Sequence, residues 1–191
     1  MMRAEKIILA SASPRRRELL AQAGFEFEVV TSDVEEVVDP SLTPDKLVMS
    51  LARQKAQAVA ADYSGCAVIG ADTVVVLDSR VLGKPKDEAD AVRMLESLSG
   101  RKHEVYTGVC IAFAGETHCF FERTSVNFCK LDGEQIKAYV ATGEPMDKAG
   151  AYGIQGKGCV LVEGIEGDYF NVVGFPVSRF CREYKKAVDK Q

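Results

Sequence analysis

Short apolar runs rich in β-branched residues alternate along this chain with longer segments whose apolar positions recur at helical spacing. The short runs predict strands over residues 6–10, 25–31, 66–77 and 159–165. The helical spacing predicts helices over residues 14–23, 43–61, 87–98, 133–141 and 176–186. Two longer β-type runs, 103–114 and 117–131, meet at Gly115 and predict a hairpin. Strands that alternate with helices, together with one long hairpin, indicate an α/β fold with a mixed sheet.

Composition and charge narrow the class of protein. The 191 residues are 47% hydrophobic and 27% charged, which suits one globular domain over residues 1–191 and excludes a disordered chain. The formal net charge of −4 argues against a stable nucleic-acid partner, since such proteins present a basic surface. No apolar stretch approaches the ~20 residues that a bilayer requires, and the run 7–10 is too short for a secretory signal. We therefore expect a cytoplasmic protein with no membrane partner.

Cysteine and histidine usage limits the metal and redox chemistry. The six cysteines include no pair at Cys-x-x-Cys spacing, so we expect small buried hydrophobic side chains rather than a zinc knuckle or a redox pair. The only histidines are His103 and His118, which excludes a multi-histidine metal cage. Carboxylates are then the plausible ligands for any metal.

The segment from Ser11 to Arg17 is a candidate phosphate site. Ser13 is a natural N-cap and Pro14 suits the first turn of a helix, whose free N–H groups and positive dipole end favour an anion. Three arginines in that turn oppose the dipole unless an anion offsets them, and arginine suits bidentate phosphate contact. The alternative is a plain helix cap with a solvated basic face. Arg17 is the expected bystander, because all three cannot reach one ligand.

Carboxylates and lysines add a second set of candidates. Asp72, in Gly-Ala-Asp-Thr at 70–73, interrupts an apolar strand, and such a residue usually pairs, binds metal or acts as a base. Glu35 and Glu36 leave a predicted strand end, although an acidic cluster is often only a solvated loop. Lys84 is restrained between glycine and proline and suits a phosphate, whereas Lys55 alone is a weak signal.

The glycine-rich stretch 150–158 fails both the Walker pattern and the Gly-x-Gly-x-x-Gly pattern. Gln155 is flanked by close-approaching backbone, so its amide could contact the edge of a base. Phosphate-binding arginines and lysines, metal-binding carboxylates and one embedded aspartate together indicate metal-assisted phosphoryl chemistry.

Several blocks in chain order carry a family resemblance. They are Ser-Ala-Ser-Pro-Arg-Arg at 11–16, Val-Glu-Glu at 34–36, Gly-Ala-Asp-Thr-Val-Val at 70–75, Gly-Lys-Pro at 83–85, Asp-Lys-Ala-Gly-Ala-Tyr-Gly-Ile-Gln-Gly at 147–156 and Asn-Val-Val-Gly-Phe-Pro at 171–176. From residue 8 to about 176 the chain resembles the Maf family of nucleoside triphosphate pyrophosphatases. The departure is Phe175, where the family usually has leucine.

The resemblance implies a fold like that of the inosine triphosphate pyrophosphatases, with two lobes around a central cleft, and a possible homodimer. It implies hydrolysis of a nucleoside triphosphate to the monophosphate and pyrophosphate with Mg²⁺ or Mn²⁺. Asp72 would be the general base and, with Glu36, a metal ligand. The residues implied in binding substrate are Ser13, Arg15, Arg16, Lys55, Thr73, Lys84 and Gln155, with Lys148 a weaker addition.

The residues tied to substrate choice resemble the branch of the family that prefers dTTP and UTP. These residues are Arg15, Thr73 and Gln155, the last within Tyr-Gly-Ile-Gln at 152–155. A glutamine amide can donate to a pyrimidine carbonyl and accept from N3–H, which suits thymine, uracil and modified pyrimidines in the nucleotide pool. The alternatives are a pyrophosphatase for 7-methyl-GTP or inosine triphosphate, and a non-catalytic nucleotide-binding regulator of septum formation.

Overall fold

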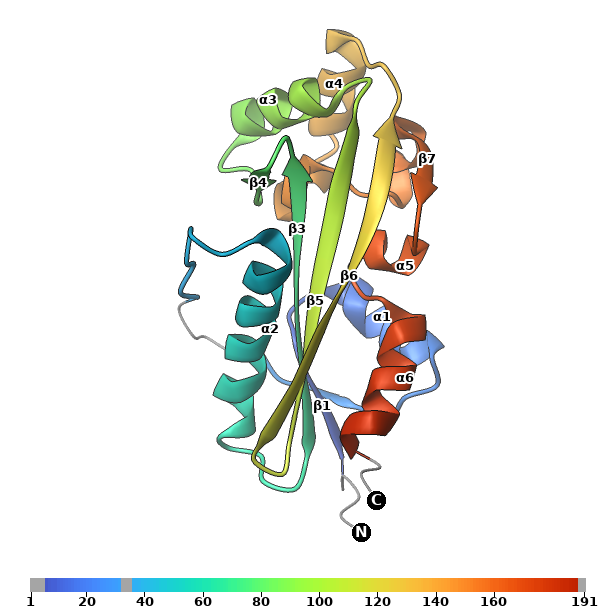
Figure 1. The fold of residues 1–191 in the computed structure, drawn as a ribbon. Helices are drawn as coiled ribbons and strands as arrows, with labels where there is room; N and C mark the ends of the chain where they lie inside the picture. Colours follow the sequence, from blue (N-terminus) through green and yellow to red (C-terminus); the bar gives the residue numbers. More distant parts are fainter. Residues whose placement is uncertain (1–5, 32–35, 189–191) are drawn as a thin grey trace. The chain divides into compact units, whose positions relative to one another are not determined.

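The computed structural model describes residues 6–31 and 36–188. Its strands are β1 (Ile7–Ala10), β2 (Glu28–Val29), β3 (Ala67–Leu77), β4 (Arg80–Leu82), β5 (Lys102–Phe113), β6 (Glu116–Phe128) and β7 (Val162–Glu166). They follow the order β2-β1-β3-β5-β6-β7, with β4 paired to β3 (Figure 1). β1 is parallel to β2 and β3, whereas β3–β4 and β6–β7 are antiparallel, so the predicted mixed sheet is confirmed.

Helices lie between consecutive strands along the chain, except in the pairs β3–β4 and β5–β6. The α-helices are α1 (Pro14–Gln22), α2 (Pro44–Ala60), α3 (Glu88–Leu98), α4 (Gly133–Val140), α5 (Tyr169–Val173) and α6 (Val177–Val188). Three 3₁₀ helices, η1 (Glu144–Asp147), η2 (Ala149–Ala151) and η3 (Gly156–Leu161), lie between α4 and β7. The chain forms two compact units. Unit 1 is residues 1–72, 107–122 and 174–191; unit 2 is residues 73–106 and 123–173.

Unit 1 is built around β1 and the adjoining halves of β3, β5 and β6. Figure 1 shows α2 on one side of these strands and α1 with α6 on the other. Gly70 on β3 and Gly108 on β5 let the strand backbones touch α2, because a Cβ on Gly70 would lie 2.2 Å from the Ala52 carbonyl oxygen and one on Gly108 would lie 2.4 Å from that of Val48. This close approach brings Lys55 of α2 beside Asp72 of β3.

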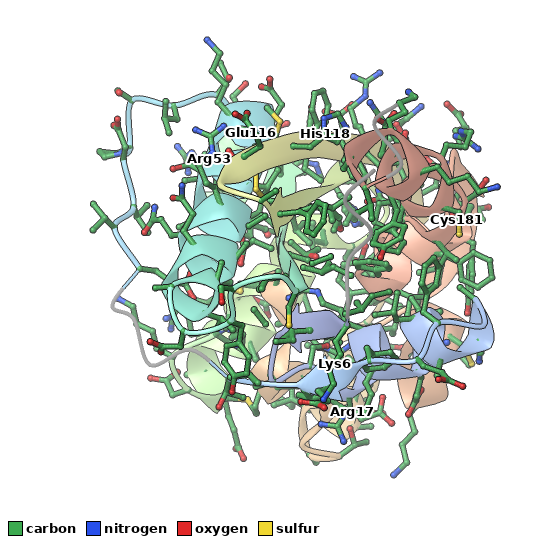
Figure 2. All side chains as sticks on the ribbon, turned by 90° about the horizontal axis from the view of Figure 1, so that it is seen from below. Lys6, Arg17, Arg53, Glu116, His118 and Cys181 are labelled. Carbon is green, nitrogen blue, oxygen red and sulfur yellow. A yellow bond between two sulfur atoms is a disulfide. The ribbon has the colours of Figure 1, made fainter. Side chains whose placement is uncertain are left out.

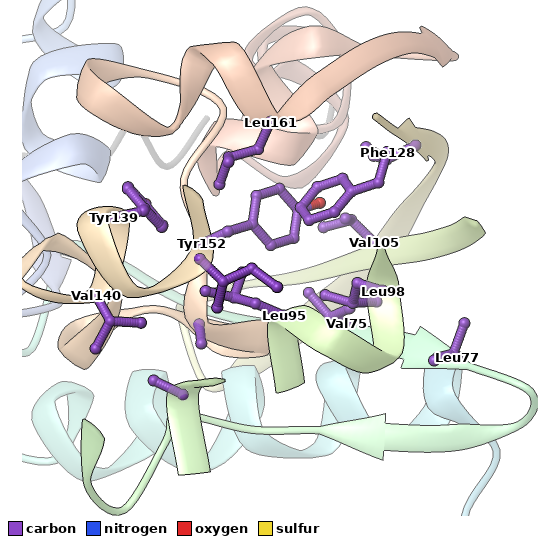
Figure 3. Close-up of a cluster of buried hydrophobic side chains, with 14 residues drawn as sticks. Val75, Leu77, Leu95, Leu98, Val105, Phe128, Tyr139, Val140, Tyr152 and Leu161 are labelled. Atoms are coloured by element: carbon purple, nitrogen blue, oxygen red, sulfur yellow. The ribbon is translucent and has the colours of Figure 1, made fainter. Parts of the chain in front are cut away.

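Unit 2 has its own apolar core, formed by α3, α4, the 3₁₀ segments and the outer parts of the long strands (Figure 3). The ring of Tyr152 packs edge to face against Phe128, with centroids 4.6 Å apart. His103 is 2% exposed and packs on both rings, and its Nε2 lies 2.7 Å from the Tyr152 hydroxyl. Ala151 and Tyr152 of the glycine-rich stretch 150–158 are part of this core.

Most of the predicted helices and strands are present. The predicted and observed elements differ mainly where the runs of strand-forming residues are short. The strand predicted over 25–31 contracts to β2, whereas β3 continues through residues 70–72, where Asp72 interrupts the apolar pattern. The start of the strand predicted over 159–165 is helical, with η3 lasting to Leu161. β4 and α5 were not predicted. Only three and five residues long, they give too little periodicity to detect.

The cysteine prediction is wrong for three of the six residues. Cys110 and Cys119 form a disulfide between β5 and β6. They are equidistant from the turn at Ala114 and Gly115, whose φ values of 52° and 80° match a tight hairpin turn, so the turn sets them opposite each other. Cys159 is exposed, whereas Cys66, Cys129 and Cys181 are half-buried. No helix in the described residues is long and apolar enough to cross a membrane.

Candidate functional site

The N-terminus of α1 is organised as the sequence predicts. Ser13 is the N-cap, and its hydroxyl accepts a hydrogen bond from the backbone N–H of Arg16. The backbone N–H of Ser13 in turn donates to the buried Ser11 hydroxyl at 3.2 Å. Pro14 occupies the first turn, and Gly24 has a φ of +81° just past the helix end. The two serines thus fix where the basic first turn of α1 begins.

Arg16 ties three segments of unit 1 together. Its Nε donates to the carbonyl of Gly174 at 2.9 Å, and its Nη1 donates to the carbonyl of Ala71 at 2.8 Å. Burial of the guanidinium lowers the pKa of Arg16, an effect opposed by the negative charge of Asp72. Because Ala71 immediately precedes Asp72, this hydrogen bond holds the strand at the residue that carries the candidate base. Sequence reasoning missed this internal role.

The other two arginines differ in exposure. Arg15 is half-buried and lowers the pKa of Arg16 by charge repulsion. Arg17 is exposed, and Figure 2 labels its side chain. The repulsion shows that two positive charges gather at the start of α1, where an anion would relieve it. The interpretation of Arg17 as a bystander stays a prediction.

Lys55 holds the two candidate metal ligands together. Its ammonium lies 2.6 Å from Oδ1 of Asp72 and 3.1 Å from Oε1 of Glu36. The side chains of Lys55 and Asp72 are 18% and 14% exposed, so this pair is largely shielded from solvent, whereas Glu36 is 40% exposed. Within the described chain no donor hydrogen-bonds to Oδ2 of Asp72. Glu35, the other acidic candidate, lies outside the described residues.

The donor set fits a divalent cation. Carboxylate oxygens of Glu36 and Asp72 converge on one cationic group, and hard oxygen ligands are those that Mg²⁺ and Mn²⁺ prefer. No group of three or more His, Cys, Asp or Glu side chains suited to a metal occurs over residues 6–31 and 36–188. Two carboxylates with substrate phosphates and waters are a usual Mg²⁺ arrangement in phosphoryl-transfer proteins.

Unit 2 carries Thr73, Lys84, Lys148 and Gln155. The loop of Lys84 is anchored on both sides, because Pro85 is buried and the Gly83 carbonyl accepts a hydrogen bond from the Gly150 N–H at 3.0 Å. The Lys84 side chain is left exposed. Thr73 is half-buried on β3. The Lys148 ammonium donates to the Glu144 carbonyl and to Asp147, so it is engaged within unit 2.

Gln155 is the most exposed of the candidate specificity residues. It lies directly before η3 in an extended conformation, and its amide makes no hydrogen bond within the part of the chain that the structure describes. The backbone before it is held by Tyr139, whose hydroxyl accepts a hydrogen bond from the Gly153 N–H at 3.1 Å. Tyr139 was not predicted as a support, since a tyrosine on an apolar helix face gives no signal beyond the core.

The structure therefore assembles two groups of predicted residues. In unit 1 it brings together Ser13, Arg16, Glu36, Lys55 and Asp72. In unit 2 it ties the loop of Lys84 to the segment that leads to Gln155. Their roles toward a substrate stay predictions.

The family described as Maf-like protein matches residues 6–187. A dTTP/UTP pyrophosphatase of Bacillus thuringiensis subsp. konkukian (strain 97-27) is 57% identical over 181 residues, which are 95% of each chain. A dTTP/UTP pyrophosphatase of Bacillus cereus (strain AH820) has the same identity and coverage. Among solved structures, the Staphylococcus aureus Ham1 protein is 17% identical with a TM-score of 0.46, covering 65% of this chain and 72% of that one.

Proposed function

Because the chain belongs to the Maf family, we propose that it hydrolyses dTTP and UTP, and modified pyrimidine triphosphates, to the monophosphate and pyrophosphate. Relatives at 57% identity over 95% of the chain are dTTP/UTP pyrophosphatases. The structure of this chain supports the proposal through the Lys55–Asp72 ion pair, which is shielded from solvent. The Glu36 carboxylate forms a second ion pair with the same Lys55 ammonium. The activity would remove such nucleotides from the cellular pool.

Asp72 is the general base of this proposal. A carboxylate can accept a proton from water through an oxygen that is not already occupied. Oδ1 is engaged by Lys55, and Oδ2 has no donor among the described residues. Water held at Oδ2 would attack the α-phosphorus, the new P–O bond would form as the bond to the bridging oxygen breaks, and pyrophosphate would leave.

The basic side chains have separate tasks in that step. Lys55 orients Asp72 and offsets negative charge between the carboxylates and the phosphates. The N-terminus of α1, with Ser13, Arg15 and Arg16, would bind phosphate oxygens, and Lys84 would neutralise charge on departing pyrophosphate. Glu36 and Asp72 would hold Mg²⁺ or Mn²⁺, which when bound polarises phosphate oxygens and lowers the pKa of coordinated water.

Gln155 is the residue proposed to recognise the base of the nucleotide. Its exposed amide offers a donor and an acceptor on the same group, which matches a carbonyl and the adjacent N3–H of thymine or uracil. Arg15 and Thr73 complete the specificity set. We place the reaction in the cytoplasm, where nucleoside triphosphates are made, and no nucleic-acid partner is needed for it. The Cys110–Cys119 disulfide would there meet reducing conditions.

A nucleotide panel tests the proposal. Purified protein is incubated with dTTP, UTP, dCTP, dGTP, inosine triphosphate and 7-methyl-GTP, with Mg²⁺, Mn²⁺ or EDTA. Phosphate is measured with and without added inorganic pyrophosphatase. We expect phosphate only when pyrophosphatase is present, dTTP and UTP ranked first, and no turnover with EDTA. Purines ranked above dTTP and UTP would contradict the pyrimidine preference, and phosphate released without pyrophosphatase would contradict pyrophosphate as the product.

A further inference from the structure

The carboxylate of Glu144, which the sequence did not single out, accepts hydrogen bonds from the backbone that follows Gln155. Glu144 begins η1, and each of its carboxylate oxygens lies 3.1 Å from the backbone nitrogen of Lys157. The intervening Gly156 has a φ of +62°, and a Cβ on it would lie 2.9 Å from Oε1 of Glu144. The carboxylate thus lies directly over the peptide segment that follows Gln155.

The other side of Gln155 is fixed by the same part of unit 2. The Gly153 N–H donates to the hydroxyl of Tyr139, and the stem of Lys148 packs where a Gly153 side chain would lie, at 3.0 Å. The ammonium of Lys148 donates to the backbone carbonyl of Glu144. Figure 3 shows Tyr139 within the unit 2 core, so this anchor is itself held by packing. The backbone two residues before Gln155 is therefore held by α4, and the backbone two residues after it is held by η1.

The side chain of Gln155 has no hydrogen-bond partner among the described residues. Its amide is exposed and makes no hydrogen bond within the described residues, whereas the backbone on both sides is held. A fixed backbone beneath an unengaged amide is what selective hydrogen bonding to a ligand requires, since preorganisation lowers the entropy lost on binding.

We propose that Glu144 is a specificity-positioning residue, which holds the Gln155–Lys157 backbone so that the Gln155 amide meets the pyrimidine edge. The inference rests on the proposed function, because it takes Gln155 as the reader of the base. Glu144 touches the protein backbone and not the reacting atoms, so it acts through Gln155. Its removal changes the choice among bases more than the chemistry of phosphate cleavage.

The test compares base selectivity in matched variants. The readout is the ratio of kcat/KM for dTTP to that for dGTP, with kcat, KM and Tm measured in parallel. Glu144→Ala should lower the ratio about tenfold, the loss expected when one hydrogen bond of about 1.4 kcal/mol is misplaced. Glu144→Gln keeps one acceptor oxygen and should lie between Glu144→Ala and wild type. Glu163→Ala removes an exposed carboxylate of β7 in the same unit and should leave the ratio unchanged.

A double variant separates positioning from plain stabilisation. If Glu144 acts through Gln155, then adding Glu144→Ala to Gln155→Ala causes no further loss of selectivity. A lower Tm with an unchanged dTTP/dGTP ratio in both Glu144 variants would overturn the inference and leave Glu144 as a structural cap. If Glu144→Ala does not fold, the ratio for Glu144→Gln decides. A wild-type protein without activity on dTTP would instead overturn the proposed function, a distinct outcome.

Discussion

The ammonium of Lys55 lies 2.6 Å from Oδ1 of Asp72, although the two residues come from different elements, α2 and β3. Both side chains are less than one-fifth exposed. Burying such a pair costs desolvation free energy unless each charge has oppositely charged or hydrogen-bonding partners. Here Glu36 gives the Lys55 ammonium a second carboxylate partner. The arrangement leaves Asp72 held at one oxygen and available at the other, which is the property a general base needs.

Asp72→Asn should sharply lower turnover while leaving triphosphate binding largely intact. The amide keeps the shape of the side chain but cannot take a proton from water, so we expect kcat to fall by about 10²–10⁴-fold. Pyrophosphate release from dTTP measures the first effect. Calorimetric titration with a dTTP analogue that has a non-hydrolysable α,β linkage measures the second.

Asp62→Asn is the matched control, because Asp62 is exposed just beyond α2 and has no site role. It should retain wild-type turnover. The same variants address the regulator hypothesis. Were the protein a non-catalytic regulator of septum formation, Asp72→Asn would leave its cellular effect intact, whereas loss of that effect in Asp72→Asn alone favours catalysis.

Arg16→Lys should lower both stability and activity. A lysine has one ammonium and cannot span the carbonyls of Ala71 and Gly174, so one buried carbonyl would lose its partner at about 1–3 kcal/mol. Urea denaturation measures the free energy of unfolding. Arg17→Lys is the control one residue away, and because Arg17 is exposed its effect should stay within about 0.5 kcal/mol. Equal effects of the two substitutions would show that Arg16 does not brace unit 1.

Gly70→Ala should impair the site by pushing the backbone of β3 away from α2. The new Cβ would lie 2.2 Å from the Ala52 carbonyl oxygen and 2.7 Å from the Ala56 nitrogen, so β3 and α2 must separate. Overpacking of this kind costs about 1–3 kcal/mol, and a shift of 1 Å at a reacting group can cost about 10²-fold in rate. Thermal unfolding and kcat are measured together. Gly133→Ala, where nothing lies within 4 Å, should retain both; a fully active Gly70→Ala would refute the argument.

His103 should make the protein acid-sensitive between about pH 6.5 and 4. Burial lowers the pKa of His103 from 6.5 to about 4, opposed by the Arg101 backbone. Below pH 6.5 the unfolded chain takes up a proton at this position and the folded chain does not. Stability is therefore lost as the pH falls, by about 1.4 kcal/mol per unit, and the loss is complete below pH 4.

Urea denaturation of wild type and His103→Gln at several pH values checks this expectation. The variant should show a shallower loss of unfolding free energy between pH 6.5 and 4. At pH 7.5 the histidine is neutral in both folded and unfolded chains, so any difference there reports only the lost packing and the lost contact with Tyr152. An identical pH slope in the two proteins would exclude His103 as the source of acid sensitivity.

The sequence identified the local features that depend on neighbours along the chain. The cap at Ser13 and the helical turn after it follow from residue types at fixed positions, and the structure has both. Asp72 stood out because a charge inside an apolar strand needs a partner. The resemblance spread over many ordered blocks, which is why the family could be named before any contact was known.

Tertiary structure decided which distant groups meet. Lys55 was a weak signal in the sequence, and only the close packing of Gly70 on α2 sets it beside Asp72. Glu144 gave no signal, because its partner, the backbone N–H of Lys157, is a group that every non-proline residue carries. Periodicity and residue type report what a segment can do alone. Contacts across many residues depend on how backbones approach one another, and that is a property of the folded chain.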